Sequence, residues 1–330
     1  MAYRASWWHR NNSSVTCDLC FHHCTLEEGQ KGICGVRMHQ KDAGLVSLNY
    51  GLVSSIAIDP VEKKPLYHWN PGTSILSLGS IGCNMYCPFC QNWQISTCSK
   101  SIPLTYISPS EIVDIARRKH LQAVSFTYNE PFVWYEYIFD SARALKKEGF
   151  SVVLVSNGMV SEEPLNELLP YIDAANIDVK AFDAPTYSLL GGDLTTVKNT
   201  VESMVKAHVH VELTSLIVPG IHKDVQWLDP LSEWASSLSP NIVLHISRYF
   251  PCYKWHEAPT PLDLLEEAQE RAKKHLSFVY LGNVQSSAIT FCPLCGSMIM
   301  ERRGYNTLLF GLDKKGNCAH CGNHIVTLTE

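Results

Sequence analysis

The chain has 330 residues, of which 45% are hydrophobic and 18% are charged, and its formal net charge is −5. This composition is that of a globular protein, and the length allows one large domain with appendages or two ordinary domains. The acidic balance argues against nucleic acid or an anionic membrane as a partner, and no apolar run reaches the length of a membrane span. Because the N-terminus also lacks an apolar signal segment, we expect a cytoplasmic protein whose clustered cysteines bind metals rather than form disulfides.

The first region in chain order, residues 1–70, is rich in cysteine. Four cysteines follow the spacing C-x2-C-x3-C-x9-C, namely Cys17, Cys20, Cys24 and Cys34. Four thiolates satisfy either a zinc ion or a [4Fe-4S] cluster, and this spacing leaves both open. His22 and His23 lie among the cysteines and widen the choice of ligands. A second cluster at this place would be able to pass electrons to a cluster elsewhere in the chain.

Residues 71–285 alternate short apolar runs with amphipathic stretches, which is the pattern of repeated βα units. Strands are predicted over residues 74–79, 123–128, 151–157, 175–179, 209–217, 242–247 and 278–281. The first helix is predicted to begin at a capping box formed by Ser108 and Glu111. Further helices are predicted over residues 134–147, 163–169, 197–206, 227–238 and 262–275. Nearly fully apolar strands predict a parallel α/β sheet covered by helices on its outer face, with fewer units than a full eight-stranded barrel.

Three cysteines follow the first of these strands in a C-x3-C-x2-C arrangement, namely Cys83, Cys87 and Cys90. Three thiolates on one short loop do not close a four-ligand metal site. A [4Fe-4S] cluster held this way keeps one iron without a protein ligand and open to a small molecule. Together with the aromatic Phe89 before the last cysteine, the spacing resembles the signature of the radical S-adenosylmethionine (SAM) enzymes.

The resemblance to radical SAM enzymes implies a fold, two cofactors and a reaction. The fold is a partial (β/α)6 barrel, similar to a TIM barrel, with its chemistry in the loops that follow the strands. The cofactors are the [4Fe-4S] cluster and SAM, whose amino and carboxylate groups bind the open iron. An electron from the cluster splits SAM into methionine and a 5′-deoxyadenosyl radical, which abstracts hydrogen from a substrate. The protein itself supplies orientation and excludes water.

Polar residues interrupt the apolar runs at the carboxyl ends of several predicted strands. Asp178 and Lys180 flank a single residue, so the alternation of side chains along a strand directs both toward the barrel interior. Two buried charges need a partner or a ligand, and a simple internal ion pair is the alternative to a binding role. Asn157, His245 and Arg248 lie near the ends of other predicted strands.

The resemblance assigns SAM-binding roles to these polar residues. Tyr128, Asn129 and Glu130 stand where the family has a Gly-Gly-Glu-Pro run that binds the methionine ammonium, although the two glycines are replaced here. Asp178 and Lys180 match the Asp-x-Lys motif of enzymes similar to the pyruvate formate-lyase activating enzyme, which reaches the ribose and the methionine carboxylate. The remaining assignments are Asn157 on the ribose side, His245 at the same cofactor, and Arg248 at the SAM carboxylate or an anionic substrate.

The C-terminal region, residues 286–330, carries two C-x-x-C-Gly knuckles. Their cysteines are Cys292, Cys295, Cys318 and Cys321. Four thiolates in two knuckles form a closed tetrahedral site, which predicts a structural zinc ribbon, with a rubredoxin-like iron as the alternative. A segment of this size has little core of its own and needs such a metal. The two remaining cysteines, Cys98 and Cys252, are expected to be buried small side chains rather than ligands.

Several blocks together resemble the radical SAM enzyme of the AmmeMemoRadiSam system. They are residues 17–24 and 32–37, 58–68, 127–131, 219–220, 245–248 and the terminal ribbon. The resemblance implies companion proteins of that system and an electron donor such as flavodoxin or ferredoxin, while the substrate, a protein or a small molecule, stays open. Three alternatives are an activating enzyme of glycyl-radical enzymes, an RNA-modifying enzyme disfavoured by the acidic charge, and a non-catalytic iron–sulfur and zinc redox scaffold.

Overall fold

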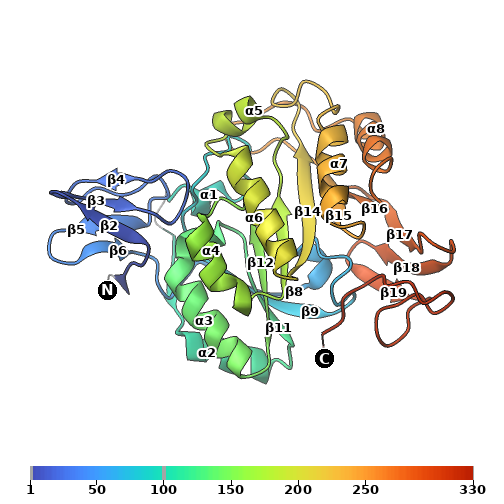
Figure 1. Ribbon diagram of the computed structural model, residues 1–330, viewed down its shortest axis with the longest axis horizontal. Coiled ribbons are helices and arrows are strands. Elements are labelled where there is room, and N and C mark those ends of the chain that lie inside the picture. The colour runs from blue at the N-terminus through green and yellow to red at the C-terminus, as the bar shows by residue number, and fades with distance from the viewer. Residues whose placement is uncertain (1–2, 99–101, 330) are drawn as a thin grey trace.

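An open barrel of eight strands forms the centre of the molecule. The computed structural model describes residues 3–98 and 102–329 (Figure 1). The strands lie in the spatial order β16-β15-β14-β13-β12-β11-β9-β8. They are β8 (Ser55–Pro60), β9 (Ser74–Gly79), β11 (Ala123–Phe126), β12 (Ser151–Ser156), β13 (Ala174–Asp178), β14 (His210–Ile217), β15 (Val243–Arg248) and β16 (Phe278–Gly282). The seven strands from β9 to β16 pair in parallel, and β8 runs antiparallel to β9. Because β8 and β16 lie at opposite edges, the sheet forms the partial barrel that the sequence predicted.

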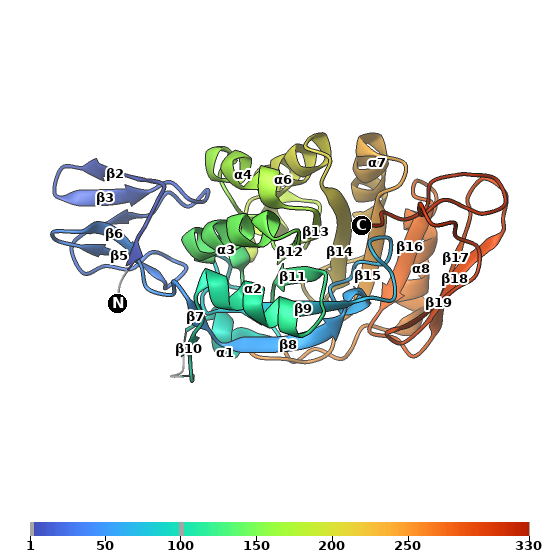
Figure 2. The ribbon, with the colours of Figure 1, turned by 90° about the horizontal axis from the view of Figure 1, so that it is seen from below.

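Helices pack along the outer side of this sheet (Figure 2). The six predicted helices are present as α2 (Pro109–Arg118), α3 (Tyr135–Lys147), α4 (Glu162–Leu168), α6 (Leu194–Lys206), α7 (Leu228–Leu238) and α8 (Leu262–Ala272). The predicted capping box begins α2. The Ser108 side chain accepts the backbone N–H of Glu111, and the Glu111 side chain accepts the backbone N–H of Ser108. Two short helices, α1 (Trp93–Ser96) and α5 (Ala184–Leu189), were not predicted because one or two turns give no clear periodicity. None of the described helices is long and apolar enough to cross a membrane.

The barrel strands and the helices share one hydrophobic core. Leu76, Val124, Leu154 and Ile177, from four adjacent strands, are at most 1% exposed and belong to the same cluster as Ile138 of α3. Burial of each such side chain stabilises the fold by about 1.5–3 kcal/mol. This packing fixes the positions of the strand ends, from which the loops of the candidate site emerge.

The N-terminal region forms two small antiparallel sheets that the sequence did not reveal. One has the order β2-β3-β4 and the other β1-β6-β5. Their strands are β1 (Tyr3–Arg4), β2 (Trp8–Asn11), β3 (Ser14–Cys17), β4 (Thr25–Leu26), β5 (Arg37–Gln40) and β6 (Gly44–Ser47), and a separate pair joins β7 (Leu52–Val53) to β10 (Thr105–Tyr106). A buried ion pair, 3.0 Å between Arg37 Nη1 and Glu136 Oε1, ties this region to α3. Residues 55–60 belong to the barrel sheet as β8, so the end of the region expected over residues 1–70 packs with the barrel.

The C-terminal region extends the molecule beyond the β16 edge (Figure 2). It contains the antiparallel sheet β17 (Ser287–Phe291), β18 (Met298–Arg303) and β19 (Asn306–Leu309). Arg302 of β18 is only 1% exposed; it donates to Thr290 Oγ1 at 3.0 Å and lies 4.2 Å from the ring centre of Tyr67. The last residues return to the barrel, where Thr327 donates its N–H to the His68 carbonyl oxygen at 2.8 Å.

Candidate functional site

The cysteine triplet lies in the loop between β9 and α1. Cys83, Cys87 and Cys90 are all partly exposed there. Gly82 enters the loop with a φ of 93°, and a Cβ at this position would lie 2.7 Å from the carbonyl oxygen of Cys34. Glycine alone combines this left-handed conformation with so close an approach of two backbones. The triplet therefore begins where the N-terminal region touches the barrel loop.

Burial raises the pKa of two thiols of the triplet. Desolvation raises the pKa of Cys87 to about 11, although the positive charge of Lys180 acts against the shift. Desolvation also raises the pKa of Cys83 well above its ordinary value, and the Glu130 carboxylate adds to the effect. Thiols in such surroundings stay protonated at neutral pH unless a cation binds them. The loop therefore fits a cluster of irons, whose positive charge would hold these sulfurs as thiolates.

The turn that follows β11 is hydrogen-bonded to the triplet loop. Asn129 accepts the N–H of Ser80 on Oδ1 at 2.8 Å and donates from Nδ2 to the Gly82 carbonyl at 3.0 Å. Asn92 donates from Nδ2 to the Tyr128 carbonyl at 2.7 Å. Tyr128 has a φ of 75°, in the left-handed region that favours glycine. Tyr128 and Asn129 thus form a turn with a glycine-like backbone, and the Asn129 side chain fixes this turn to the triplet loop.

Glu130 is buried at the end of this turn and is only 3% exposed. Its Oε1 accepts the backbone N–H of Phe132 at 2.9 Å and the hydroxyl of Ser156 at 2.7 Å, and its Oε2 accepts the backbone N–H of Asn157 at 2.8 Å. Burial raises the pKa of Glu130 to about 7, although these donors favour the ionised form. A carboxylate offers about four acceptor positions, so Glu130 has capacity for one further donor.

Asn157 joins the β12 end to the triplet. Its Nδ2 lies 3.0 Å from Oδ1 of Asn84 and 3.7 Å from Sγ of Cys83. Donors near cluster sulfurs adjust the reduction potential of iron–sulfur clusters. Asn157 therefore contacts a predicted cluster ligand directly, and its role on the SAM ribose stays a prediction.

Asp178 and Lys180 form an ion pair beside the triplet. Lys180 Nζ lies 2.9 Å from Asp178 Oδ2, and the intervening Val179 is fully buried. Burial alone would lower the pKa of Lys180, but the negative charges of Asp178 and Cys87 raise it, so the ammonium stays charged. The side chains of Lys180 and Asp178 keep 19% and 37% of their surface exposed. The pair is therefore accessible to a polar ligand as well as paired internally.

His245 lies level with Asp178 across the sheet, since Asp178 pairs with Thr214 and Thr214 with His245. His245 Nε2 is 2.6 Å from Oε2 of Glu212, and Oε1 of Glu212 is 3.1 Å from Nε2 of His210. Burial alone would raise the pKa of Glu212, but its hydrogen bonds to the two histidines hold it well below its usual value. His245 is 3% exposed, so its partners here are protein groups and its role at SAM stays a prediction.

Glu212 is the residue of this network that sequence analysis missed. It is fully buried and also accepts the backbone N–H groups of Tyr67 at 2.9 Å and His68 at 2.7 Å. A signal was present, because Glu212 is a carboxylate in the middle of the apolar run 209–217. A charge in a buried strand requires partners from elsewhere in the chain.

Arg248 ends β15 and points to the loop that follows. Its Nε donates to the Thr260 carbonyl at 2.8 Å, and its guanidinium lies 5.1 Å from the ring centre of Phe250. The structure thus gives Arg248 a part in shaping this loop. Contact with SAM or an anionic substrate stays a prediction.

The loop after β15 closes over the triplet loop. Lys254 donates its N–H to the Pro88 carbonyl at 2.9 Å, and Cys252 Sγ lies 3.7 Å from the Cys90 carbonyl oxygen. Cys98 and Cys252 are both partly exposed, so the expectation that they are buried was wrong. Both lie in loops rather than in the packed interior of the strands, which explains the difference.

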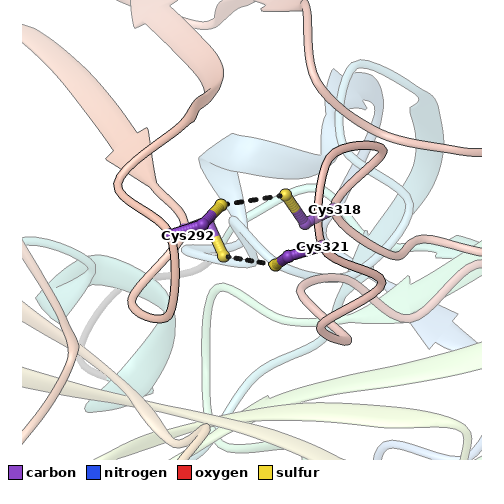
Figure 3. A group of neighbouring side chains, drawn as sticks. Cys292, Cys318 and Cys321 are labelled. Atoms are coloured by element: carbon purple, nitrogen blue, oxygen red, sulfur yellow. Dashed lines mark hydrogen bonds between the residues drawn. The ribbon is translucent and has the colours of Figure 1, made fainter.

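The C-terminal cysteines converge on one point, as Figure 3 shows for Cys292, Cys318 and Cys321. The ligand atoms of Cys292, Cys295, Cys318 and Cys321 all lie within 4.8 Å of one another. Sγ of Cys292 is 3.5 Å from Sγ of Cys321, and Sγ of Cys295 is 3.6 Å from Sγ of Cys318. A tetrahedral zinc ion with Zn–S bonds of about 2.3 Å separates its sulfurs by about 3.8 Å. The ribbon therefore fits a single metal ion. At the other end of the chain, Cys17, Cys20, Cys24 and Cys34 line a small cavity.

Comparison with known proteins agrees with this arrangement. The sequence profile of the Radical SAM superfamily matches residues 78–231, which include the triplet, Glu130 and the Asp178–Lys180 pair. The uncharacterised protein MJ0808 of Methanocaldococcus jannaschii is 37% identical over 323 residues, which cover 96% of each chain. The chain belongs to the radical SAM superfamily.

Other relatives of this radical SAM chain are more distant. The putative glycyl-radical enzyme activating enzyme MJ1227 of Methanocaldococcus jannaschii is 25% identical over 211 residues, or 62% of this chain and 84% of that protein. The crystal structure of Streptococcus suis SuiB bound to S-adenosylmethionine shares the fold with a TM-score of 0.50 at 12% identity, over 67% of this chain and 52% of that one. Membership confirms the predicted α/β fold and the enzyme class, and it supports a [4Fe-4S] cluster and SAM as cofactors.

Proposed function

We propose that this radical SAM enzyme holds a [4Fe-4S] cluster on Cys83, Cys87 and Cys90 and cleaves SAM reductively to a 5′-deoxyadenosyl radical, which abstracts hydrogen from a substrate. When bound, the cluster supplies an electron and one iron that lacks a protein ligand. The observation that carries the proposal is the position of three loop thiols next to Asn157 and the Lys180 ammonium. Thiolates, a cation and buried acceptors at one end of a parallel barrel form a site for a polar cofactor.

The residues around the loop complement the charged ends of SAM. Lys180 offers an ammonium to the methionine carboxylate, and Asp178 offers an acceptor to a ribose hydroxyl. Glu130 has capacity for one further donor and so suits the methionine ammonium. The carbonyl groups of the clamped Tyr128–Asn129 turn are further acceptors for that ammonium. The Tyr128 carbonyl accepts a hydrogen bond from Asn92, and the Asn129 side chain donates one to the Gly82 carbonyl, so the turn is fixed against the triplet loop.

Three more residues complete the proposed site. Asn157, whose amide nitrogen lies 3.7 Å from the Cys83 sulfur, would bind the ribose of SAM. His245 is oriented by ionised Glu212, and Arg248 shapes the loop that covers the triplet. The hydrogen bond from the Lys254 N–H to the Pro88 carbonyl holds that loop against the triplet loop, and this contact restricts the access of water to the site.

Anaerobic reconstitution followed by a 5′-deoxyadenosine assay tests the proposal. The protein with SAM and a strong reductant should form 5′-deoxyadenosine, and the triple variant Cys83→Ser, Cys87→Ser, Cys90→Ser should form none. Cys98→Ser is the matched control, since Cys98 is a partly exposed thiol outside the triplet. Cleavage of SAM by the triple variant at the rate of the parent would refute the assignment of the triplet.

We also propose that Cys292, Cys295, Cys318 and Cys321 hold a structural zinc ion. The short distances between sulfurs from two loops support a single tetrahedral ion. Elemental analysis of protein produced in a medium with both iron and zinc tests the choice. One zinc retained after removal of all iron supports zinc, whereas one tightly held iron at this place supports the rubredoxin-like alternative.

From the resemblance to the AmmeMemoRadiSam enzyme, we propose that the chain acts with companion proteins of that system and a flavodoxin or ferredoxin donor. The likeness to a putative glycyl-radical enzyme activating enzyme favours a second candidate, in which the abstracted hydrogen comes from a glycine of a partner polypeptide. Electron paramagnetic resonance after turnover separates them. A stable glycyl radical on an added partner protein supports activation, and its absence with continued 5′-deoxyadenosine formation supports the first candidate.

A further inference from the structure

The four N-terminal cysteines surround one small cavity. The cysteines that line it are Cys17, Cys20, Cys24 and Cys34. Cys17 ends β3 and Cys24 precedes β4, and the N–H of Cys17 donates to the Cys24 carbonyl at 3.0 Å. All four thiols are free. Short turns therefore bring four potential thiolate ligands to a shared interior space.

The sulfurs around this cavity are spaced more widely than those of the ribbon. Over residues 3–98 and 102–329, only the ribbon gathers three or more ligand atoms within 4.8 Å of one another. A single zinc ion requires sulfurs about 3.8 Å apart. A [4Fe-4S] cluster binds each thiolate on a different iron and so spreads its four sulfur ligands around a larger body. The N-terminal arrangement suits the cluster better than one ion.

A buried positive charge borders the same cavity. Arg37 lines it and is 1% exposed. Its Nη1 is paired with Glu136, but its buried Nε–H finds no acceptor among the groups that the structure describes. An unsatisfied buried donor is costly, and a sulfur atom in the cavity would accept it. The guanidinium also compensates the negative charge of four thiolates.

The cavity lies directly against the triplet loop. Asn84, the residue after Cys83, lines it as well. His22 Nε2 lies 2.7 Å from the Asn84 carbonyl oxygen, so this nitrogen is the donor and is not available as a metal ligand. This contact joins the N-terminal cysteine region to the triplet loop itself, because Asn84 lies between Cys83 and Cys87.

We propose that Cys17, Cys20, Cys24 and Cys34 hold a second [4Fe-4S] cluster, fully ligated by protein and adjacent to the Cys83 loop. The proposal does not depend on SAM cleavage, because it concerns ligands outside the triplet. Four protein thiolates leave no iron open, so this cluster binds no SAM.

Metal analysis of the full chain after anaerobic reconstitution tests the proposal. The parent protein should contain about eight irons, and the triple variant Cys83→Ala, Cys87→Ala, Cys90→Ala should retain about four. The retained iron should give the Mössbauer spectrum of a [4Fe-4S] cluster. A complementary variant, Cys17→Ala with Cys20→Ala, should lose about half of the parent's iron and keep the zinc of the ribbon. Cys252→Ala is the control for loss of a single thiol.

Two results would overturn the proposal. A triplet variant without iron but with about two zinc ions would assign zinc to the N-terminal cysteines. A triplet variant with neither iron nor a second zinc would mean that these cysteines bind no metal. Both results leave the proposed SAM chemistry intact, since the parent protein would still contain about four irons and form 5′-deoxyadenosine.

Discussion

The two four-cysteine regions at the ends of the chain have the same number of thiols but different geometry. In the ribbon, two loops bring the sulfurs within 4.8 Å of one another, far from the residues of the triplet in sequence. In the N-terminal region, the thiols surround a cavity that Arg37 and Asn84 also line. The ribbon packs its own small core, including Ile299 and Val326, against β16. The N-terminal region instead shares the main core with the barrel.

The number of thiol ligands alone therefore does not determine which metal a site binds or what that metal does. Close thiols in a segment with a small core indicate a structural ion, because the metal supplies the cohesion that the core lacks. The wider spacing of the N-terminal thiols beside the triplet loop supports the larger cofactor that we propose for them. Four variants test this contrast, from Cys318→Ser with the largest expected change in free energy to Lys180→Met with the smallest.

The largest effect is expected from Cys318→Ser in the ribbon. Cys318 is 1% exposed, and loss of its thiolate should release the proposed zinc ion. Because the binding free energy of a structural zinc ion, about 10–16 kcal/mol in zinc-finger peptides, is also folding free energy, the ribbon should unfold locally. Zinc content and hydrogen exchange of residues 286–329 measure the change. The control Cys252→Ser should keep the zinc content and the hydrogen-exchange protection of the parent. A ribbon that stays protected from exchange without zinc would contradict a structural role of the metal.

Glu212→Gln tests the link between the ribbon and the barrel. Glu212 accepts the N–H of Tyr67, on which Arg302 of the ribbon stacks. Removing a buried charge from its partners should cost about 3–5 kcal/mol. Glu267→Gln, in an exposed pair with Arg271, should cost less than about 1 kcal/mol. Denaturant unfolding at neutral pH measures both changes.

The loss of stability caused by Glu212→Gln should depend on pH. The pKa of Glu212 is lowered on folding, so its contribution is present above the ordinary value of 4.5 and is lost as the pH falls toward its folded pKa. The difference in stability between the parent and Glu212→Gln should therefore shrink below about pH 4.5. A difference that grows on acidification would show that Glu212 is protonated in the folded protein.

The barrel was predictable from sequence because each strand is a short apolar run followed by an amphipathic helix. The N-terminal sheets were not, because their strands have two to four residues and pair over long separations, as Tyr3 does with Ser47. Strand β8 was missed for a related reason. It is an edge strand whose apolar run, residues 56–58, is only three residues long and is followed by Asp59 and Pro60, so it does not resemble a central strand.

The candidate site also has a part that was predictable from sequence and a part that was not. Spacing alone placed Cys83, Cys87 and Cys90 on one loop, and alternation alone placed Asp178 and Lys180 on one face. The position of Asn157 against Cys83 depends on strands from different parts of the chain, and sequence spacing does not contain it. The role of Glu212 likewise depends on partners that the fold brings together from three segments.

Gly82→Ala tests the contact between the N-terminal region and the triplet loop. A Cβ at Gly82 would meet the Cys34 carbonyl, whereas one at Gly149, which also has a positive φ of 81°, would meet nothing within 4 Å. Both alanine variants should lose about 1–2 kcal/mol through backbone strain. Gly82→Ala should lose about 1–3 kcal/mol more by overpacking and should bind less iron with unchanged zinc. Equal stability and iron content in the two variants would show that the contact between the N-terminal region and the triplet loop does not affect iron binding.

The smallest effect is expected from Lys180→Met, which removes a charge but keeps the length of the side chain. A hydrogen bond to a charged group is worth about 1.5–3 kcal/mol, so the dissociation constant for SAM should rise about 10–100-fold while the iron content stays the same. Lys146→Met is the matched control, since Lys146 pairs with Asp173 at 2.7 Å at the start of β13 rather than at its end. Calorimetric titration of both reconstituted variants with SAM measures the change. If Lys180→Met binds SAM as tightly as the control, the Asp178–Lys180 pair is a structural ion pair, and the charged groups that orient SAM lie on other strands of the barrel.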